Sequence, residues 1–298
     1  MINNVRQVLD THRHEIAFIV GNGINRYRSR NNGNSWDELL LTLWKNRVDA
    51  SQDTIPNGIS LTEFYDILEI HNSDDSRRGD LQKEFCDLMS GWSHERHHEL
   101  FIDFAKRINT PVLTTNFEDI LQKAGELSQF RTNTDGFTDY YPWETYFGKA
   151  QLNYPTDGFG VWHINGMQKY HRSIRLGLSH YMGSVERARA LIHKGNENRL
   201  FTGKDVHNWK GVKSWLHIIF NKSLFIFGLG LGENEVFMRW LLIERAKYYQ
   251  KFPERRRSGW YLTSAGDNNA GKKLYLEKIG FQYVELQDYS DIYETIWR

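Results

Sequence analysis

Four short segments of the chain carry residue types that could bind a nucleotide and act on it. They comprise residues 21–25, 114–118, 161–166 and 227–233, and an apolar run leads into each of them. A glycine-rich turn after a buried strand lets backbone N–H groups approach a phosphate closely. Because such a turn also occurs where the chain only needs a positive φ, one segment alone is a weak signal. The four together predict a nucleotide site.

Taken in order, the four segments resemble the NAD-binding core of the sirtuin (SIR2) superfamily, and most closely its bacterial SIR2-like branch associated with phage defence. The family pattern is a Gly-Ala-Gly-x-Ser-type loop, a Thr-x-Asn-x-Asp segment, a His near a Gly at a strand end, and a late Gly-x-Ser/Gly-Leu loop. The resemblance runs from Phe18 to about the last predicted strand. It implies that the protein is an NAD+ hydrolase that releases ADP-ribose and nicotinamide.

The resemblance also assigns the contacts with NAD. The first loop would hold the pyrophosphate through backbone amides, and the last loop would pass close to the adenosine ribose or phosphates. Each loop could equally be a plain strand–helix turn. Glu118 stands where the family has Asp, and it would bind ribose or cap the following helix. The predicted NAD-binding residues are Gly21, Asn22, Gly23, Ile24, Asn25, Thr115, Glu118, Gly228, Gly230 and Leu231.

Asn116 and His163 are the predicted catalytic residues. Breaking the bond between nicotinamide and ribose creates an oxocarbenium-like centre, beside which a neutral amide can orient a water or a ribose hydroxyl. An imidazole titrates near neutrality and can act as general base, a contribution of about 10²–10⁴-fold. In the family Gly directly follows the His, whereas here two residues intervene, so Asn165 is an alternative for that position. His171 and His180 are alternative bases, and a helix cap is the alternative role of Asn116.

Two other functions stay open at this point. Cys86 is the only cysteine, so the chain has neither a CxxC zinc pair nor an intrachain disulfide. Protein-deacylating sirtuins usually carry a four-cysteine zinc ribbon, so NAD-dependent deacylation or ADP-ribosyl transfer would lack its usual peptide-binding module. The other alternative is a non-catalytic module that senses NAD or ADP-ribose.

Two further patterns are predicted not to form sites. His94, Glu95 and His98 match the zinc-protease pattern H-E-x-x-H. No third ligand is evident and an apolar stripe continues along the same helix, so no metal site is predicted. Nucleic-acid processing driven by a metal at His94 and His98 is a further alternative function. The basic run 255–257 is interpreted as a solvated face, with phosphate or nucleic-acid contact as the alternative.

Composition sets broad limits on partners and location. The 298 residues include 38 basic and 37 acidic side chains, so direct nucleic-acid binding is not expected. The first residues lack the build of a signal peptide and no apolar stretch reaches about 20 residues, so a cytoplasmic protein without membrane contact is expected. Aromatic residues make up 14% of the chain, a content typical of a ring-rich core and of homo-oligomer interfaces. The resemblance implies an abortive-infection effector gated by oligomerisation, a nucleotide signal or a partner such as a HerA-type ATPase or helicase.

Apolar runs alternating with helical patterns predict an α/β fold, a Rossmann-like and mostly parallel sheet flanked by helices, in one domain over 1–298. A helical insertion is predicted at 51–110, and a loop-rich lid or partner surface at 130–160. Ligand sites form outside the C-terminal ends of parallel strands, so the four segments are expected to converge there. Strands are predicted at 16–20, 111–115, 160–164, 174–178, 223–227, 259–263 and 281–286, and helices at 39–48, from about 117, after 184, at 235–249 and at 270–279.

Overall fold

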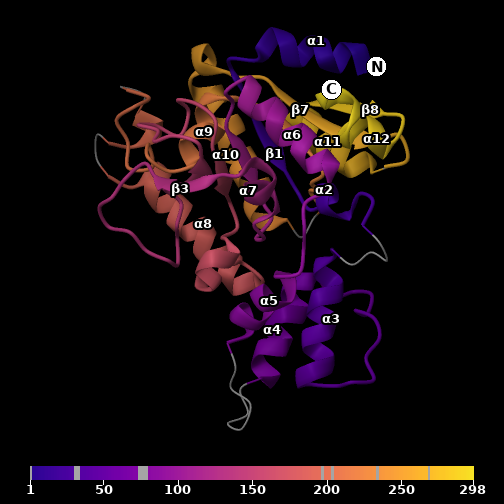
Figure 1. Cartoon of the computed structure of the whole chain (residues 1–298). Coiled ribbons are helices and arrows are strands. Elements are labelled where there is room, and N and C mark those ends of the chain that lie inside the picture. The colour runs from indigo at the N-terminus through magenta and orange to yellow at the C-terminus, as the bar shows by residue number, and fades with distance from the viewer. Residues whose placement is uncertain are drawn as a thin grey trace.

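In the computed structural model, a central β-sheet is covered by helices on both faces (Figure 1). The structure describes residues 2–29, 34–72, 80–195, 198–202, 205–232, 235–267 and 269–298. Its strands are β1 (Ile16–Val20), β2 (Val112–Thr114), β3 (Ser128–Arg131), β4 (Thr145–Gly148), β5 (Val161–His163), β6 (Ser223–Phe227), β7 (Gly259–Ser264) and β8 (Gln282–Leu286).

The α-helices account for slightly less than half of the remaining described residues. They are α1 (Ile2–His12), α2 (Gly23–Arg26), α3 (Trp36–Arg47), α4 (Leu61–His71), α5 (Leu81–Met89), α6 (Arg96–Arg107), α7 (Ile120–Gly125), α8 (Leu178–His193), α9 (Leu216–Asn221), α10 (Val236–Lys251), α11 (Ala270–Lys278) and α12 (Tyr289–Tyr293). Within the described ranges, none of these helices combines the length and the apolar character needed to cross a bilayer.

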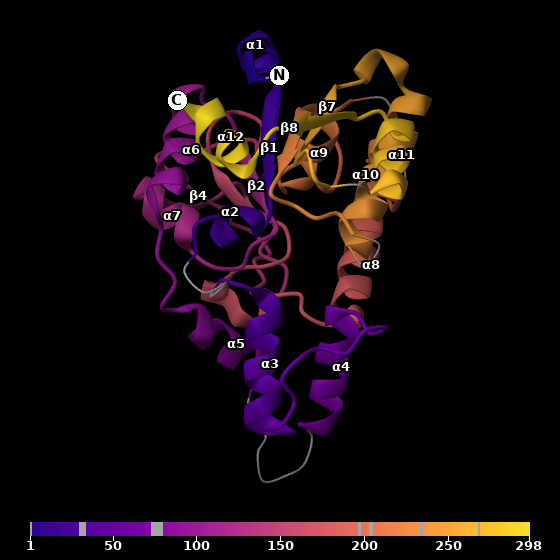
Figure 2. The ribbon, with the colours of Figure 1, turned by 90° about the vertical axis from the view of Figure 1, so that its right-hand side faces the viewer.

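The strand order across the sheet is β3-β4-β5-β2-β1-β6-β7-β8. The six strands from β5 to β8 in this order run parallel to one another. At the other edge, β4 pairs antiparallel with both β5 and β3. Figure 2 shows α6, α7 and α12 on one side of the sheet and α8, α10 and α11 on the other. The predicted fold class, a mostly parallel α/β sheet flanked by helices, is confirmed.

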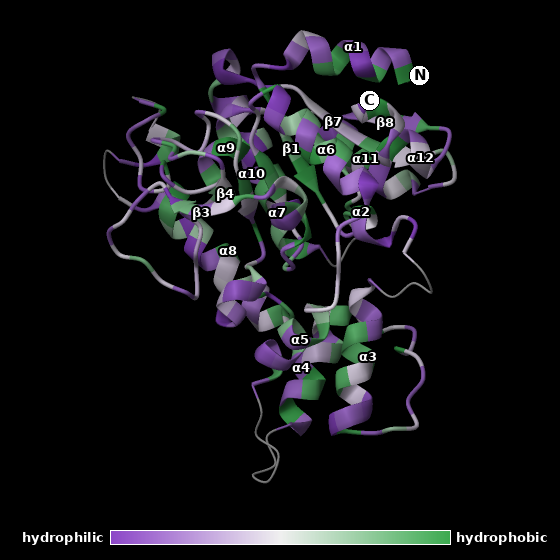
Figure 3. Ribbon diagram, viewed as in Figure 1, coloured by the Kyte–Doolittle hydropathy of each residue, from purple (hydrophilic) through white to green (hydrophobic). Residues whose placement is uncertain are grey.

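The central strand β1 is apolar throughout because both of its faces are covered. Ile16, Phe18 and Val20 pack toward α6 and α12, whereas Ala17 and Ile19 pack toward α9 and α10. All five side chains are 0% exposed. A parallel strand buried on both faces needs a continuous apolar run rather than alternation, and Figure 3 shows this hydrophobic centre in green.

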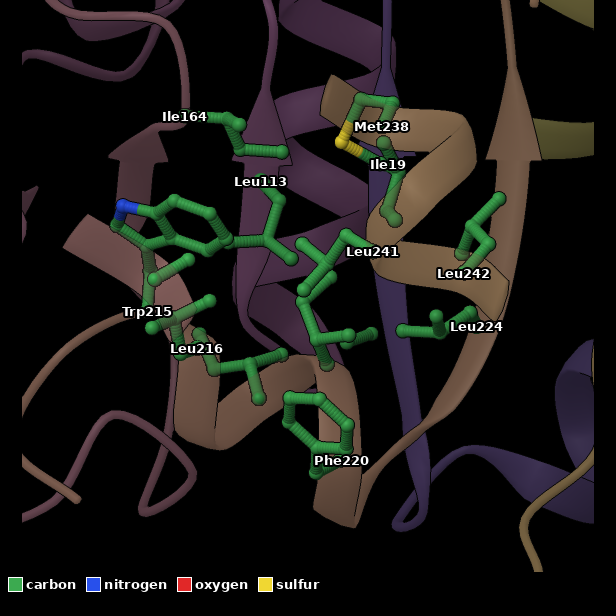
Figure 4. Packing of buried hydrophobic residues seen from close by; sticks show 14 of the residues in the cluster. Ile19, Leu113, Ile164, Trp215, Leu216, Phe220, Leu224, Met238, Leu241 and Leu242 are labelled. Atoms are coloured by element: carbon green, nitrogen blue, oxygen red, sulfur yellow. The ribbon is translucent and has the colours of Figure 1, made fainter. Parts of the chain in front are cut away.

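Helices α8 to α11 cover one face of the sheet. The apolar cluster between them and the sheet is the larger of the two main clusters. Figure 4 shows its centre, where side chains of α9 and α10 interdigitate with those of β1, β2 and β6. The residues labelled there are Ile19, Leu113, Ile164, Trp215, Leu216, Phe220, Leu224, Met238, Leu241 and Leu242.

The other side of the sheet is closed by a ring cluster around Trp297. The centroids of Phe18, Phe101 and Phe227 lie 5.4, 5.1 and 5.1 Å from the Trp297 ring. The Trp297 side chain is 2% exposed. Residues from near the start, the middle and the end of the chain therefore complete one core.

Helices α3, α4 and α5 form a separate unit beyond the C-terminal ends of the strands (Figures 1 and 2). They share an apolar cluster of their own, which the loops after β2 and before α8 join through Phe117 and Ile174. The predicted insertion at 51–110 differs from this unit at both ends. It omits α3, and it includes α6, whose Phe101 and Phe104 pack on the sheet. Residues 73–79 of that prediction lie outside the described residues.

Other sequence predictions are wrong in detail. Residues 174–177 are not a strand, and α8 begins at Leu178 instead of after residue 184. The helix expected from about residue 117 begins at Ile120. The 130–160 region contains β4, whose Tyr146 is 0% exposed, so part of it belongs to the sheet and its core.

The packing of α10 predicts a contrast between two neighbouring positions. Leu241 is 0% exposed, whereas Ile243 is 36% exposed. Leu241→Ala is expected to lower the free energy of unfolding by about 2–5 kcal/mol, because it removes buried contacts and leaves a cavity. Ile243→Ala is the control and is expected to cost less than about 1 kcal/mol. Urea titration followed by circular dichroism measures both, and equal losses would contradict this description of α10.

Candidate functional site

The four segments singled out in the sequence begin at one edge of the sheet. His163 of β5 pairs with Thr114 of β2, Thr114 pairs with Val20 of β1, and Val20 pairs with Phe227 of β6. These residues form one row across four adjacent strands. The chain continues from each of them into a loop at the C-terminal edge, so the expected convergence occurs.

A pocket of about 660 Å³ lies against this edge. Its walls come from the loops after β1, β2 and β6, from the end of β7, from α12, and from Trp36 and Leu61 of the α3–α5 unit. Of the predicted NAD-binding residues, Asn22, Gly23, Thr115, Gly228 and Gly230 line it. The others, Gly21, Ile24, Asn25, Glu118 and Leu231, lie outside the lining, as do the predicted catalytic residues Asn116 and His163.

The two glycine loops pack directly against each other. A Cβ on Gly21 would lie 2.6 Å from the carbonyl oxygen of Gly228, and a Cβ on Gly23 would lie 2.9 Å from the same oxygen. The Gly23 N–H donates to that oxygen at 2.8 Å. Gly228 itself has a φ of +64°, which glycine adopts at little cost. The glycine spacing in the sequence is therefore required by this loop–loop contact.

The second glycine loop, residues 228–231, has all four carbonyl groups occupied. Its N–H groups, in contrast, donate to no acceptor in the ranges the structure describes. A run of peptide N–H groups without acceptors attracts anions. The donors to the four carbonyls are, in chain order, Gly23 N–H (2.8 Å), the Tyr261 hydroxyl (2.6 Å), Lys272 Nζ (3.3 Å) and Arg239 Nη1 (3.0 Å).

A chain of buried polar groups supports the first glycine loop from behind. His98 Nδ1 accepts the Glu95 N–H at 2.9 Å, so its Nε2 carries a proton and donates to Asn25 Oδ1 at 3.1 Å. Burial and the neighbouring His97 lower the pKa of His98 to about 3, which keeps the ring neutral. The Asn25 amide then donates to Asn22 Oδ1 at 2.8 Å and to Glu118 Oε1 at 2.9 Å.

Two neighbouring histidines support the first glycine loop: His98, the last residue of the H-E-x-x-H pattern, and His97, which lies at one of its unspecified positions. His97 Nε2 lies 2.8 Å from the carbonyl oxygen of Ile24, and His98 holds Asn25. Both histidines are buried in the first turn of α6. Within the described residues, no three His, Cys, Asp or Glu side chains are grouped as metal ligands.

Glu118 is a buried carboxyl group next to this chain. It is 2% exposed, and burial raises its pKa to about 7, with the hydrogen bond from Asn25 opposing the shift. Its Oε2 has no hydrogen-bond partner among the described residues. Near neutral pH the side chain is therefore present in both protonation states.

Three further side chains behind the pocket wall have buried polar atoms without partners. They are the Thr115 hydroxyl and the amides of Asn116 and Asn165, which form no hydrogen bond of normal geometry with a described residue. The Asn116 amide is nevertheless close enough to Glu118 to lower the pKa of its carboxyl, against the larger effect of burial. Asn116 is 0% exposed and follows Thr115, which lines the pocket. An unpaired buried polar group costs about 1–3 kcal/mol, so such groups call for a functional explanation.

His163 is held by hydrogen bonds at both ring nitrogens. Nε2 accepts from the Gln122 amide at 2.6 Å, and Nδ1–H donates to the backbone carbonyl of Asn116 at 2.6 Å. Burial lowers its pKa to about 4, and the side chain is 1% exposed. The neutral ring fixes the loop that carries Asn116. Of the alternative bases, His171 pairs with Asp80 at 2.9 Å and His180 accepts backbone N–H groups at 3.3 Å.

Sequence reasoning missed much of the pocket wall. Tyr261, Thr263 and Asp267 come from the end of β7, and Tyr289 and Tyr293 come from α12. The predicted strand 259–263 already placed Thr263 at a C-terminal strand end, so its polar continuation to Asp267 was an available signal. The sequence around the tyrosines of α12 contained no such signal, because only the folded structure brings that helix next to the glycine loops. Arg26 and Arg28 also line the pocket, and they follow the first loop directly.

Comparison with known proteins adds no assignment. The sequence matches no protein-family model, and it matches no curated protein.

The raised pKa of Glu118 predicts a pH-dependent stability difference. The carboxyl ionises near 4.5 in the unfolded chain but near 7 in the folded protein. Folding stability is therefore lost as the pH rises through this interval, whereas a glutamine cannot ionise. Glu118→Gln is expected to raise the free energy of unfolding at pH 8 by about 3 kcal/mol and to have little effect at pH 4.5.

Urea titrations at the two pH values measure this difference. The control is Glu186→Gln, at an exposed position on α8, which is expected to leave the pH dependence unchanged. An equal effect of Glu118→Gln at both pH values would show that the carboxyl ionises normally.

Proposed function

We propose that the pocket at the C-terminal edge binds NAD and that the protein hydrolyses it to ADP-ribose and nicotinamide. The observation that carries this proposal is loop 228–231, whose carbonyls are all occupied while its N–H groups have no acceptor in the described chain. Peptide N–H groups in such a loop suit the oxygens of a pyrophosphate. Gly230 has no heavy atom within 4 Å of an ideal Cβ, so a ligand can approach the backbone closely there.

The rest of the pocket suits a dinucleotide in size and chemistry. Its volume of about 660 Å³ lies within the usual range for small-molecule sites of about 300–1,000 Å³. Arg26, which forms no ion pair with the described residues, can add positive charge near the phosphates. Asp37 and Asp267 supply carboxylates for ribose hydroxyls, and Tyr289, 56% exposed, supplies a ring for a base.

The hydrolysis needs few groups, and the segment after β2 supplies them. As the bond between C1′ and nicotinamide breaks, its electron pair leaves with nicotinamide and a water adds to C1′. The Asn116 amide, unpaired and adjacent to Thr115, would orient that water. The ionised Glu118 carboxylate would accept its proton. With both nitrogens bonded, His163 serves best as a positioning residue for Asn116.

The resemblance to bacterial SIR2-like proteins supports the same reaction. It extends the proposal to phage defence by NAD depletion, with gating by a homo-oligomer or by a partner such as a HerA-type ATPase.

A second candidate is a binding module that senses NAD or ADP-ribose without cleaving it. This alternative is favoured by the position of Asn116, Glu118 and His163. All three lie behind the residues that line the pocket, and their side chains are 0–2% exposed. Binding without nicotinamide release would favour this alternative.

Asn116→Ala is expected to abolish most of the activity. Incubation with NAD and chromatographic detection of nicotinamide and ADP-ribose should show a loss of about 10²–10³-fold, because the variant lacks the amide that orients the attacking water. Asn153→Ala, at an exposed position between β4 and β5, is the matched control and should retain full activity. Unchanged nicotinamide release by Asn116→Ala would remove Asn116 from the reaction.

Gly230→Ala tests binding separately from cleavage. The added methyl group meets nothing in the free protein but occupies the wall where the phosphates would lie, so the fold should persist while affinity for NAD and ADP-ribose falls at least tenfold. Gly91→Ala, whose Cβ also meets nothing, is the control. Isothermal titration calorimetry measures both variants. Failure of the wild-type protein to bind either ligand would overturn both candidate functions.

A further inference from the structure

A second pocket, of about 740 Å³, lies at the opposite end of the sheet. It is bounded by the starts of β7 and β8, the second half of α10 and the end of α11. In Figure 2 the connection from α10 to β7 lies at the end of the molecule away from the α3–α5 unit. The proposed NAD site uses none of its lining residues.

Positive charge dominates this second pocket. Its cationic lining residues are Arg245, Lys247, Arg256, Arg257 and Lys278, against one acidic residue, Glu277. Lys247 is neutralised by Glu244 at 2.7 Å. Among the residues that the structure describes, Arg257 forms only a long contact of 4.0 Å with Glu15.

The remaining cations have less compensation. Arg256 and Lys278 form no ion pair with any residue that the structure describes, and both are exposed. The positive charge also affects Lys222 nearby. Its pKa is lowered, mainly by burial and secondly by the charge of Arg257. An anionic ligand would relieve this repulsion.

The floor of the pocket is rigid. Arg245 is 1% exposed, and its guanidinium donates to the carbonyls of Ile219, Lys222, Arg257 and Ser258 at 2.9 to 3.2 Å. These bonds fasten the α10–β7 connection, and with it the backbone of Arg257, to the helix. The backbone that carries Arg257 is therefore fixed before a ligand binds, which lowers the entropic cost of binding at that position.

The lining also indicates how a ligand would be recognised. Tyr249 is the one aromatic ring among the lining residues, all of which are described, and it is 3% exposed. The Arg245 guanidinium lies 4.6 Å from the centre of its ring. No open ring face is left for a base to stack on, so charge must supply the affinity. The concave shape favours a compact ligand over a long polymer.

From this arrangement, we propose that the second pocket is a binding site for a small ligand that carries consecutive phosphate groups, held by Arg256, Arg257 and Lys278. Such a ligand matches a pocket lined by these three cations and needs no base recognition. Inorganic tripolyphosphate is the simplest probe of this chemistry.

Calorimetric titration of the full chain with tripolyphosphate tests the site. Binding is expected for the wild-type protein and should weaken as salt is raised. Arg256→Glu combined with Lys278→Glu should reduce the affinity at least tenfold. Lys83→Glu combined with Arg96→Glu, at positions 61% and 72% exposed, changes the net charge equally and should retain it. Circular dichroism verifies that both variants fold.

Four results would overturn the proposal. The first is no binding to the wild-type protein, and the second is an equal loss in the two double variants, which would reflect net charge alone. The third is tighter binding of a 20-base-pair DNA duplex than of tripolyphosphate, lost in the Arg256→Glu and Lys278→Glu variant, which would assign the surface to a nucleic-acid backbone. A loss caused by Gly230→Ala would move the binding to the first pocket and count equally against it.

Discussion

The contact between the two glycine loops organises this protein's candidate site. Gly21 and Gly23 let the backbone after β1 lie against the backbone of Gly228, and the Gly23 N–H occupies the first carbonyl of the second loop. The side chains of Tyr261, Lys272 and Arg239 occupy the next three. The strand row sets the position of both loops, and their mutual contact sets which backbone groups remain available to a ligand.

Two buried neutral histidines hold the loops that follow β1 and β2. His98 acts through Asn25, and His163 acts through the carbonyl of Asn116. In both cases burial lowers the pKa, so a neutral ring that donates from one nitrogen and accepts at the other is the stable form. Two carboxyl groups, Glu118 and the pocket-lining Glu235, have pKa values raised to about 7 by burial. The proposed proton transfer is assigned to Glu118 because it lies two residues after Asn116.

Sequence reasoning predicted the parts of this fold that one local pattern determines. The apolar run of β1 has a single explanation, a strand covered on both faces, and the loop after it must lie at the sheet edge. Local patterns gave wrong predictions where the same apolar spacing can be buried by two different kinds of packing. Ile174 and Leu176 alternate as in a strand, but they are buried by the α3–α5 unit without strand pairing. The apolar stripe of α6 packs on the sheet. The spacing of its apolar residues would be the same if α6 belonged to a helical insertion, so the sequence could not distinguish the two. His163 was interpreted from its residue type, whereas its partner Gln122 lies 41 positions away.

The closure of one sheet face by Trp297 has a consequence for synthesis of the chain. The central strand β1 leaves the ribosome about 200 residues before its neighbour β6, and the ring cluster is completed later still. Until then its apolar surface lacks its final cover, and such long-range closure slows folding. The nascent protein therefore has a long interval in which chaperones can bind it and in which premature termination would yield an aggregation-prone fragment.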